Sequence, residues 1–367
     1  MGSGRGGGEE DKPSCSMDSP PDAALRTSDF EYDLPTDLIA QFPSAVRGES
    51  RLLAVRRAGD GTGEGLRDLT FADFPSLVAP GDLLVFNSTR VRHARLIGRR
   101  PSGAPAEVLL IHPADDGWIA MGKPGSALLP GKRIELDRGL AVETLEVLED
   151  GYRKVRFLGG TAEEAMARFG RLPLPPYLDR EPTPEDEVRY QTVLAEQEGS
   201  VAAPTAGLHF TAELLAALCA RGAHVVCLDL EVGPGTFRPI EVADFRQHAM
   251  HAERYHIPES VSREVGEARS RTSPVWAIGT TVVRALEAAA TPEGAVRAGP
   301  GQTNLMIAPG YEFRVVDKLV TNFHLPRSSL LLLVAAFAGY RTIRAAYRHA
   351  IQHQYRFYSY GDAMAIS

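Results

Sequence analysis

The feature that most constrains the fold is a change of pattern near the middle of the chain. Between about residues 52 and 155, short apolar runs are separated at close spacing by Gly, Pro and Asp. Pro80-Gly81 and Pro130-Gly131 mark two of these breaks, where proline presets φ and glycine permits a positive φ. This pattern is typical of an antiparallel barrel or sandwich.

After residue 160, strand-like and helix-like segments alternate. We expect strands at 224–232, 275–279 and 320–325. We expect helices at 162–169, 184–194, 211–218, 259–270 and 282–290, followed by two C-terminal helices. The alternation predicts an α/β fold with a largely parallel sheet or a barrel-like arrangement.

Composition predicts a globular chain with a short tail. The 367 residues are 44% hydrophobic and 24% charged, which allows two domains or one large one. Residues 1–27 are rich in Gly, Pro, Ser and acidic residues, so we predict a disordered tail, with a targeting or docking arm as the alternative. The net charge of −7 does not indicate a general nucleic-acid binder. Any RNA site must therefore be a local basic patch.

The cysteines and the longest apolar run indicate a cytoplasmic protein. Cys15, Cys219 and Cys227 are too few and too scattered for a disulfide scaffold or a zinc site. The apolar run at 329–338 is too short to cross a bilayer and predicts a buried helix. We therefore expect no membrane partner.

The segment 199–211 is the most informative motif. Its small residues, among them Pro204, Thr205 and Gly207, precede His209 and a helix start. Small residues let backbone N–H groups approach a ligand, and a histidine can exchange protons near neutral pH. The alternative is a tight buried turn in which the histidine is satisfied by neighbours.

Two glycine-containing junctions follow predicted strands, where ligands bind in α/β sheets. The first holds Glu231, Gly235 and Thr236, and Glu231 is a candidate for binding ribose hydroxyls or taking a proton. The second, at 278–284, holds four further candidate residues: Gly279, Thr280, Thr281 and Arg284. Its threonines suit helix capping equally well, whereas its arginine could bind a carboxylate.

Two further segments carry histidines. At 248–253, His248 and His251 are three residues apart, whereas helical zinc motifs need four. We therefore predict that His251 and Glu253 line a pocket and hold no metal. At 321–329, Asn322 and His324 lie at the end of a predicted strand.

The densest basic stretch lies at 90–100. Arg90, Arg92, Arg95 and Arg99 are the candidate contacts to an RNA phosphate backbone. A solvated charged face is the alternative.

Ten blocks of this sequence, in one order, resemble the S-adenosylmethionine:tRNA ribosyltransferase-isomerase family of queuosine synthesis. They span residues 29–366 and lie at 32–43, 80–98, 171–178, 189–211, 232–240, 248–253, 278–287, 309–313, 315–339 and 355–364. The resemblance implies a larger α/β barrel-like domain, at 28–75 and 156–367, with a smaller antiparallel β-barrel domain inserted at 76–155.

The resemblance also implies a reaction. The ribosyl unit of S-adenosylmethionine is joined to the aminomethyl group of the modified base preQ1 in tRNA, and the products are epoxyqueuosine-tRNA, adenine and methionine. S-adenosylmethionine is then a co-substrate, and neither a cofactor nor a metal is needed. Such chemistry requires proton transfer, for which His209, His324 and His251 are the candidates, without assigned roles. We expect a monomer.

Three blocks depart from the family pattern. Ser88 stands where the family usually has Asp, Glu231 where it usually has His, and Gln302 and Asn304 lie in a third altered block. These changes leave two alternatives open: a related transferase with another acceptor, and a non-catalytic nucleotide- or RNA-binding relative.

Overall fold

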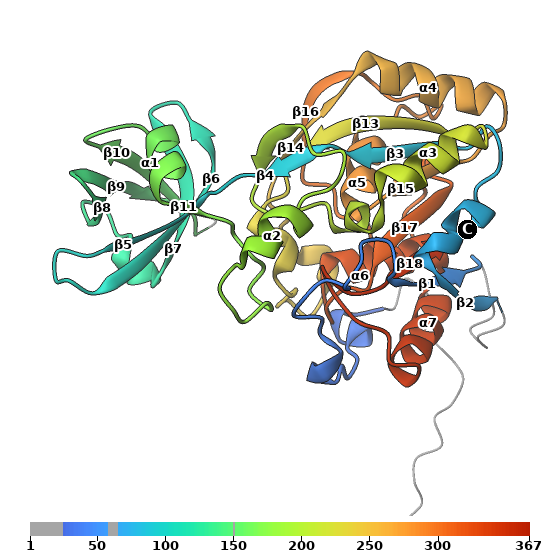
Figure 1. The fold of residues 1–367 in the computed structure, drawn as a ribbon, viewed down its shortest axis with the longest axis horizontal. Helices are drawn as coiled ribbons and strands as arrows, with labels where there is room; N and C mark the ends of the chain where they lie inside the picture. Colours follow the sequence, from blue (N-terminus) through green and yellow to red (C-terminus); the bar gives the residue numbers. More distant parts are fainter. Residues whose placement is uncertain (1–24, 58–64, 150) are drawn as a thin grey trace, which may run out of the picture.

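The computed structural model describes residues 25–57, 65–149 and 151–367 (Figure 1). The tail prediction for residues 1–24 lies outside the described residues. The last three residues of the predicted tail, 25–27, do not fit the prediction. Leu25 and Thr27 are buried, and the 3-10 helix η2 (Thr27–Phe30) begins at Thr27. The N-terminal edge of the packed structure therefore lies before residue 27.

A nine-stranded mixed sheet forms the centre of the larger part. In spatial order its strands are β16 (Gly299–Thr303), β14 (Glu253–Ile257), β13 (His224–Leu230), β3 (Leu83–Asn87), β15 (Val275–Ile278), β17 (Lys318–Asn322), β18 (Ala363–Ile366), β1 (Arg51–Val55) and β2 (Leu66–Thr70). The four central strands, from β13 to β17, are parallel, whereas the outermost pairs at both ends are antiparallel. The expectation of an α/β fold is confirmed, and the expectation of a largely parallel sheet is confirmed for the four central strands.

Both faces of this sheet are covered, which explains the continuous apolar strands. On β3, Leu83 and Val85 belong to the core cluster that includes the helices α4 (Glu259–Ser270), α5 (Thr280–Ala289), α6 (Ser329–Ala338) and α7 (Tyr340–Gln352). Leu84 and Phe86 point to the other face. There they join a second cluster with the 3-10 helix η4 (Phe71–Leu77) and α3 (Ala212–Ala220).

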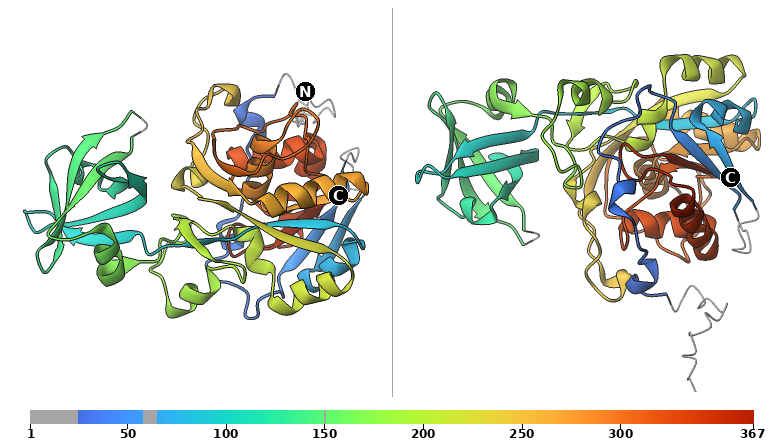
Figure 2. Two further views of the ribbon diagram at one scale, coloured as in Figure 1. Left: turned by 90° about the horizontal axis from the view of Figure 1, so that it is seen from above. Right: turned by 60° about the horizontal axis from the view of Figure 1, so that its bottom comes forward.

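A seven-stranded antiparallel sheet lies to one side of the larger part in all the views (Figures 1 and 2). Its spatial order is β11 (Gly170–Arg171), β5 (Arg95–Arg99), β6 (Pro105–Ala114), β7 (Gly117–Lys123), β10 (Arg153–Leu158), β9 (Leu140–Val147) and β8 (Arg133–Asp137). Arg99 of β5 also pairs with Glu135 of β8. Helix α1 (Ala162–Phe169) adds Ala162 and Ala165 to the core of this sheet.

The predicted boundaries at 75/76 and 155/156 do not follow the strand pairing. Strand β3 lies in the middle of the large sheet, although a short apolar run at 83–87 resembled its β-rich neighbours in sequence. At the other boundary, β10, α1 and β11 continue the smaller sheet to residue 171. The smaller unit in the structure therefore covers about residues 95–171.

Two short connections lie where the two parts meet. Strands β4 (Thr89–Val91) and β12 (Gln197–Ser200) form a parallel pair of their own. Helix α2 (Pro184–Arg189) is shorter than the predicted 184–194, and the chain turns at Tyr190.

The predicted buried helix at 329–338 is confirmed as α6. Within the described ranges no single helix is long and apolar enough to cross a membrane. Helices α6 and α7 pass such a test only as a pair, by length and composition, and they are bent by 114° at the break between them.

Candidate functional site

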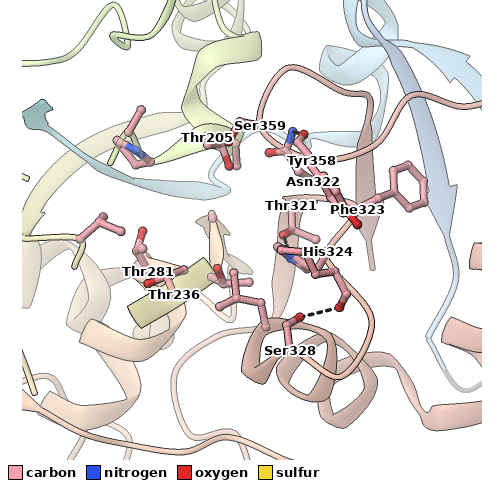
Figure 3. Close-up of a pocket in the computed structure, with 18 of the residues that line it drawn as sticks. Thr205, Thr236, Thr281, Thr321, Asn322, Phe323, His324, Ser328, Tyr358 and Ser359 are labelled. Carbon is pink, nitrogen blue, oxygen red and sulfur yellow. Dashed lines mark hydrogen bonds between the residues drawn. The ribbon is translucent and has the colours of Figure 1, made fainter. Parts of the chain in front are cut away.

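A pocket opens at the carboxyl ends of β15 and β17, next to the 203–206 loop (Figure 3). We call it the first pocket. Gly279 precedes α5 with φ of 103°, a conformation that favours glycine, and so turns the chain from β15 into the helix. The residues that line the pocket are Tyr177, Ala203, Pro204, Thr205, Ala206, Val232, Thr236, Gly279, Thr280, Thr281, Thr321, Asn322, Phe323, His324, Leu325, Ser328, Leu330, Tyr358 and Ser359.

A second pocket adjoins the first and shares Val232 and Thr236 with it. The smaller sheet contributes Ile111 of β6, and Tyr152 precedes β10. The remaining lining residues are His112, Gly199, Glu231, Gly233, Gly235, His248, Met250, His251, Ala252, Glu253, Arg254 and Arg284. The second pocket is therefore lined by residues from both the larger part and the smaller unit.

Most of the predicted site residues meet here. The first pocket is lined by Pro204, Thr205, Thr236, Gly279, Thr280, Thr281, Asn322 and His324. The second is lined by Glu231, Gly235, Thr236, His251, Glu253 and Arg284. Gly207 and His209 line neither. A Cβ atom at Gly207 would lie 2.9 Å from Cγ2 of Thr192, so packing against that side chain accounts for this glycine.

His209 is buried behind the first pocket. Its ring stacks on Phe71 with the centroids 4.9 Å apart. Nδ1 lies 2.7 Å from Oγ of Ser50, and Nε2 lies 3.1 Å from Nδ2 of Asn322. Burial, together with repulsion from Arg47, lowers the pKa of His209 to about 4. Of the two interpretations left open by the sequence, this geometry favours the buried histidine satisfied by its neighbours.

His324 is the histidine that lines the first pocket. Its Nε2 lies 2.8 Å from Oγ1 of Thr321, and its backbone N–H donates to the hydroxyl of Tyr347 over 2.8 Å. The Tyr32 hydroxyl donates to its carbonyl oxygen. Burial lowers the pKa of His324 to about 3, so the imidazole is neutral at pH 7.

His251 lines the second pocket from the loop before β14. Its ring stacks on Tyr152, with centroids 4.8 Å apart, and so bridges the two parts of the chain. A Cβ atom at Gly235 would come within 2.9 Å of its ring, so a larger residue there would require the His251 ring to shift. Among the described residues, no group of three or more His, Cys, Asp or Glu side chains is placed to hold a metal ion.

Arg284 is paired with a carboxylate of the protein itself, whereas the sequence suggested that it could bind the carboxylate of a ligand. It forms a buried ion pair with Glu253, and its Nε donates to the carbonyl of Leu305 over 3.3 Å. The other Glu253 oxygen accepts from the Gly233 N–H and the Thr236 hydroxyl, both at 3.2 Å. The pair therefore fixes the 233–236 loop, of which Thr236 lines both pockets.

Two of the residues that depart from the family pattern, Glu231 and Ser88, have hydrogen-bond partners within the protein. Oε2 of Glu231 accepts two bonds from Arg254, at 2.7 and 3.2 Å. Ser88 lines neither pocket, and its hydroxyl donates to Asp229 over 2.8 Å. The carboxylate of Glu231 is thus paired with a positive charge of the protein, whereas Ser88 is neutral and only donates a hydrogen bond.

The four predicted RNA-binding arginines do not form one exposed patch. Arg92 is buried and donates to the Glu198 carbonyl, and Arg90 donates to the Ala195 carbonyl. Both arginines therefore hold the segment around β12. Arg95 is paired with Glu107 and Glu181. Arg99 is exposed, and its guanidinium donates to the Gly103 carbonyl over 3.0 Å.

With this geometry in place, the chain can be compared with known proteins. The model of the queuosine biosynthesis protein family matches residues 27–366. The chain belongs to this family. A relative from Thiobacillus denitrificans, named S-adenosylmethionine:tRNA ribosyltransferase-isomerase, is 49% identical over 93% of this chain and 97% of its own. One of the same name from Anaeromyxobacter dehalogenans is 48% identical over 93% and 99%.

A solved structure is also similar to this queuosine biosynthesis protein. The S-adenosylmethionine tRNA ribosyltransferase from Thermotoga maritima is 34% identical, with a TM-score of 0.53. The comparison covers 92% of this chain and 100% of the other. It supports the mixed α/β fold described above.

Several pocket residues of this family member were not singled out from the sequence. Tyr358 and Ser359 come from the segment before β18, and Tyr177 from the 171–178 segment. Both segments belong to the ten blocks that resemble the family, and this resemblance was the sequence signal that could have identified these residues. Ser50 lay outside every motif, and only the fold brings it to His209.

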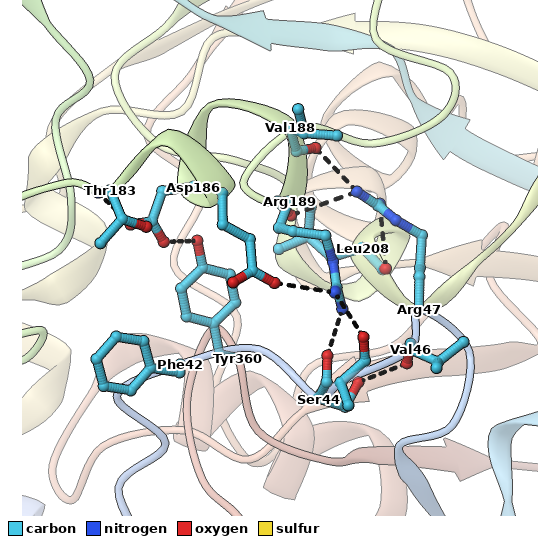
Figure 4. A network of polar contacts seen from close by, with 12 residues as sticks. Phe42, Ser44, Val46, Arg47, Thr183, Asp186, Val188, Arg189, Leu208 and Tyr360 are labelled. Carbon is cyan, nitrogen blue, oxygen red and sulfur yellow. Dashed lines mark hydrogen bonds and ion pairs between the residues drawn. The ribbon is translucent and has the colours of Figure 1, made fainter.

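A polar network holds the segments behind the first pocket together (Figure 4). Arg47 donates to the carbonyls of Val188, Gln191 and Leu208. Nearby, Asp186 is fully buried and accepts from Arg180 at 2.6 and 2.8 Å and from Tyr360 at 2.6 Å. These bonds tie α2 and the His209 turn to the N-terminal and C-terminal segments.

Proposed function

We propose that this chain is an S-adenosylmethionine:tRNA ribosyltransferase-isomerase. The observation that carries the proposal is identity of about half with relatives of that name, over nearly the whole length of both chains. The enzyme transfers and isomerises the ribosyl part of S-adenosylmethionine onto preQ1 in tRNA. The products are epoxyqueuosine-tRNA, adenine and methionine.

The reaction begins with loss of a proton from the carbon beside the sulfonium, whose positive charge acidifies that carbon. It also needs a hydrogen bond or a proton for the departing adenine. His324 and His251 are our candidates for these transfers, because each lines one of the two adjoining pockets. His209 lines neither and acts through the side chain of Asn322.

The remaining expectations are proposals as well. We propose that residues 95–171 are a separate β-barrel domain, supported by the β5–β8 pairing that joins strands far apart in the sheet order. We propose that the larger part is barrel-like, and that the enzyme acts as a cytoplasmic monomer without a bound metal or cofactor. Activity that survives chelation and dialysis would support the last point.

The proposed reaction is tested by adenine release. The purified chain is incubated with S-adenosylmethionine and with one of two otherwise identical tRNAs, one carrying preQ1 and one carrying guanine at the same position. We expect one adenine for each preQ1 consumed, and none with the guanine tRNA. Adenine release that is the same with both tRNAs would indicate another acceptor, and none with either would indicate a non-catalytic relative.

A further inference from the structure

Two residues that line the first pocket each carry a buried side-chain oxygen that makes no hydrogen bond to the described part of the chain. These oxygens are Oδ1 of Asn322 and Oγ1 of Thr281. The residues are 3% and 8% exposed, and both appear among the labelled lining residues in Figure 3. Leaving such an atom unpaired typically costs about 1–3 kcal/mol. A ligand that pairs with both would recover that cost.

The amide of Asn322 can have only one orientation. Its Nδ2 lies 3.1 Å from the Tyr358 carbonyl oxygen and 3.1 Å from Nε2 of His209. A carbonyl oxygen only accepts hydrogen bonds, so rotating the amide by 180° would place two acceptors against each other. The Oδ1 atom is therefore the one amide atom of Asn322 that is left without a partner among the described residues, and it can only accept.

His209 must be in one tautomer to fit this arrangement. Both Asn322 amide hydrogens are used, so Nε2 of His209 has to be the unprotonated acceptor. The proton then lies on Nδ1 and is donated to Oγ of Ser50, 2.7 Å away. Burial, which lowers the pKa of His209, keeps the ring neutral. Ser50, His209 and Asn322 thus form a chain of bonds that ends at the pocket.

The first pocket suits an uncharged group. None of the described residues that line it is Asp, Glu, Lys or Arg, and His324 is neutral at pH 7. The adjoining second pocket is lined by Glu231, Arg254 and two further charged residues. In S-adenosylmethionine the base is uncharged, whereas the methionyl end carries an ammonium, a carboxylate and the sulfonium. The uncharged first pocket therefore suits the base end of this molecule.

We propose that Asn322 determines specificity for adenine by accepting a hydrogen bond from its exocyclic amino group. Thr281 supplies a second hydrogen-bonding group to the same base, and His209 and Ser50 are positioning residues that hold the Asn322 amide. The assignment rests on the proposed function, because it takes the adenosyl donor from it. Since the amino group is not the leaving nitrogen, loss of this bond weakens binding more than it slows chemistry.

The test uses the full chain without tRNA and compares two ligands by calorimetry. S-adenosylhomocysteine keeps the amino group, and S-inosylhomocysteine has an oxygen in its place. The wild-type chain should bind the adenosyl compound about tenfold more tightly or better, because the inosyl oxygen would face Oδ1. Equal affinities, or tighter binding of the inosyl compound, would overturn the assignment. Binding of neither would instead count against the proposed function.

Variants of Ser50 and Asn322 distinguish a role in positioning the Asn322 amide from a role in folding. Ser50→Ala removes the acceptor for Nδ1 of His209 and should reduce the preference for the adenosyl compound several-fold, whereas Ser50→Thr, which keeps a hydroxyl, should retain it. With active enzyme, Ser50→Ala should raise KM for S-adenosylmethionine while kcat changes little. A preference that Ser50→Ala and Asn322→Ala leave at the wild-type value, in protein with an unchanged melting temperature, would contradict the proposal.

Discussion

Asn322 and His209 are joined by a hydrogen bond of 3.1 Å, but only Asn322 lines the first pocket. His209 therefore influences a bound ligand through the orientation of another side chain. If His209 were itself a proton donor or acceptor, its replacement would lower kcat by about 10²–10⁴. From its position we expect a different pattern. His209→Gln should raise KM for S-adenosylmethionine more than it lowers kcat, in steady-state measurements of adenine release.

His324 offers the contrasting case, because its side chain lines the first pocket. His324→Gln should lower kcat for adenine release by about 10²–10⁴. The matched control is His353→Gln, on the exposed surface at the end of α7, which should retain wild-type kcat. If both variants had the wild-type kcat, His324 would take no part in proton transfer.

The buried pair Arg284–Glu253 should matter far more for stability than the half-exposed pair Arg254–Glu231. Arg284→Met leaves the Glu253 carboxylate buried without its partner, which typically costs about 3–5 kcal/mol. Arg254→Met removes a partner from a pair whose side chains are 37% and 34% exposed, and should cost about 1 kcal/mol or less. Urea unfolding of both variants measures the two losses, and a loss for Arg284→Met no larger than that for Arg254→Met would contradict this prediction.

Stability should fall in mild acid because of the two buried histidines. Their pKa values, about 4 for His209 and about 3 for His324, lie below the unfolded value of about 6.5. The unfolded chain then binds more protons than the folded one below pH 6.5. Each histidine therefore leaves stability intact above pH 6.5 and lowers it by up to about 1.4 kcal/mol per pH unit as the pH falls toward its folded pKa.

The contribution of His209 to this loss of stability in acid can be measured directly. The free energy of unfolding is determined between pH 7 and pH 4.5 for the wild type and for His209→Gln. The variant should lose less stability than the wild type over this range. Parallel curves would mean that the pKa of His209 is not lowered by folding.

The basic stretch should divide into structural and RNA-binding arginines. Arg99 is exposed, so Arg99→Ala should weaken tRNA binding and reduce the slope of log affinity against log salt by about one unit, without changing the melting temperature. Arg92 is buried beside Trp118, so Arg92→Ala should lower the melting temperature. A salt slope that is unchanged in Arg99→Ala would place the RNA elsewhere.

Local patterns predicted much of the fold. The apolar run at 329–338 became α6, and the helix expected at 211–218 became α3 (Ala212–Ala220). The sequence assigned β3 to the wrong unit, because its four consecutive apolar residues do not reveal which strands lie beside them. That information is carried by pairing with β13 and β15, more than 100 residues away in sequence.

For the site, the motifs located the right segments but not the direction of each side chain. Asn322 and His324 lie at the end of β17, as strand ends in α/β sheets predict. His209 turned inward, since Phe71 and Ser50 offered its ring a stacking partner and a hydrogen bond. Ser50 itself carried no signal, because its role depends on a contact across 159 positions.

The most direct test of the central claim is mass analysis of the tRNA after the reaction. A tRNA carrying preQ1 is incubated with the chain and with S-adenosylmethionine that is isotopically labelled in its ribose, and is then digested to nucleosides. We predict that the preQ1 nucleoside is converted to epoxyqueuosine that carries the ribose label. Unchanged preQ1 under conditions in which the chain is folded and binds the tRNA would contradict the account.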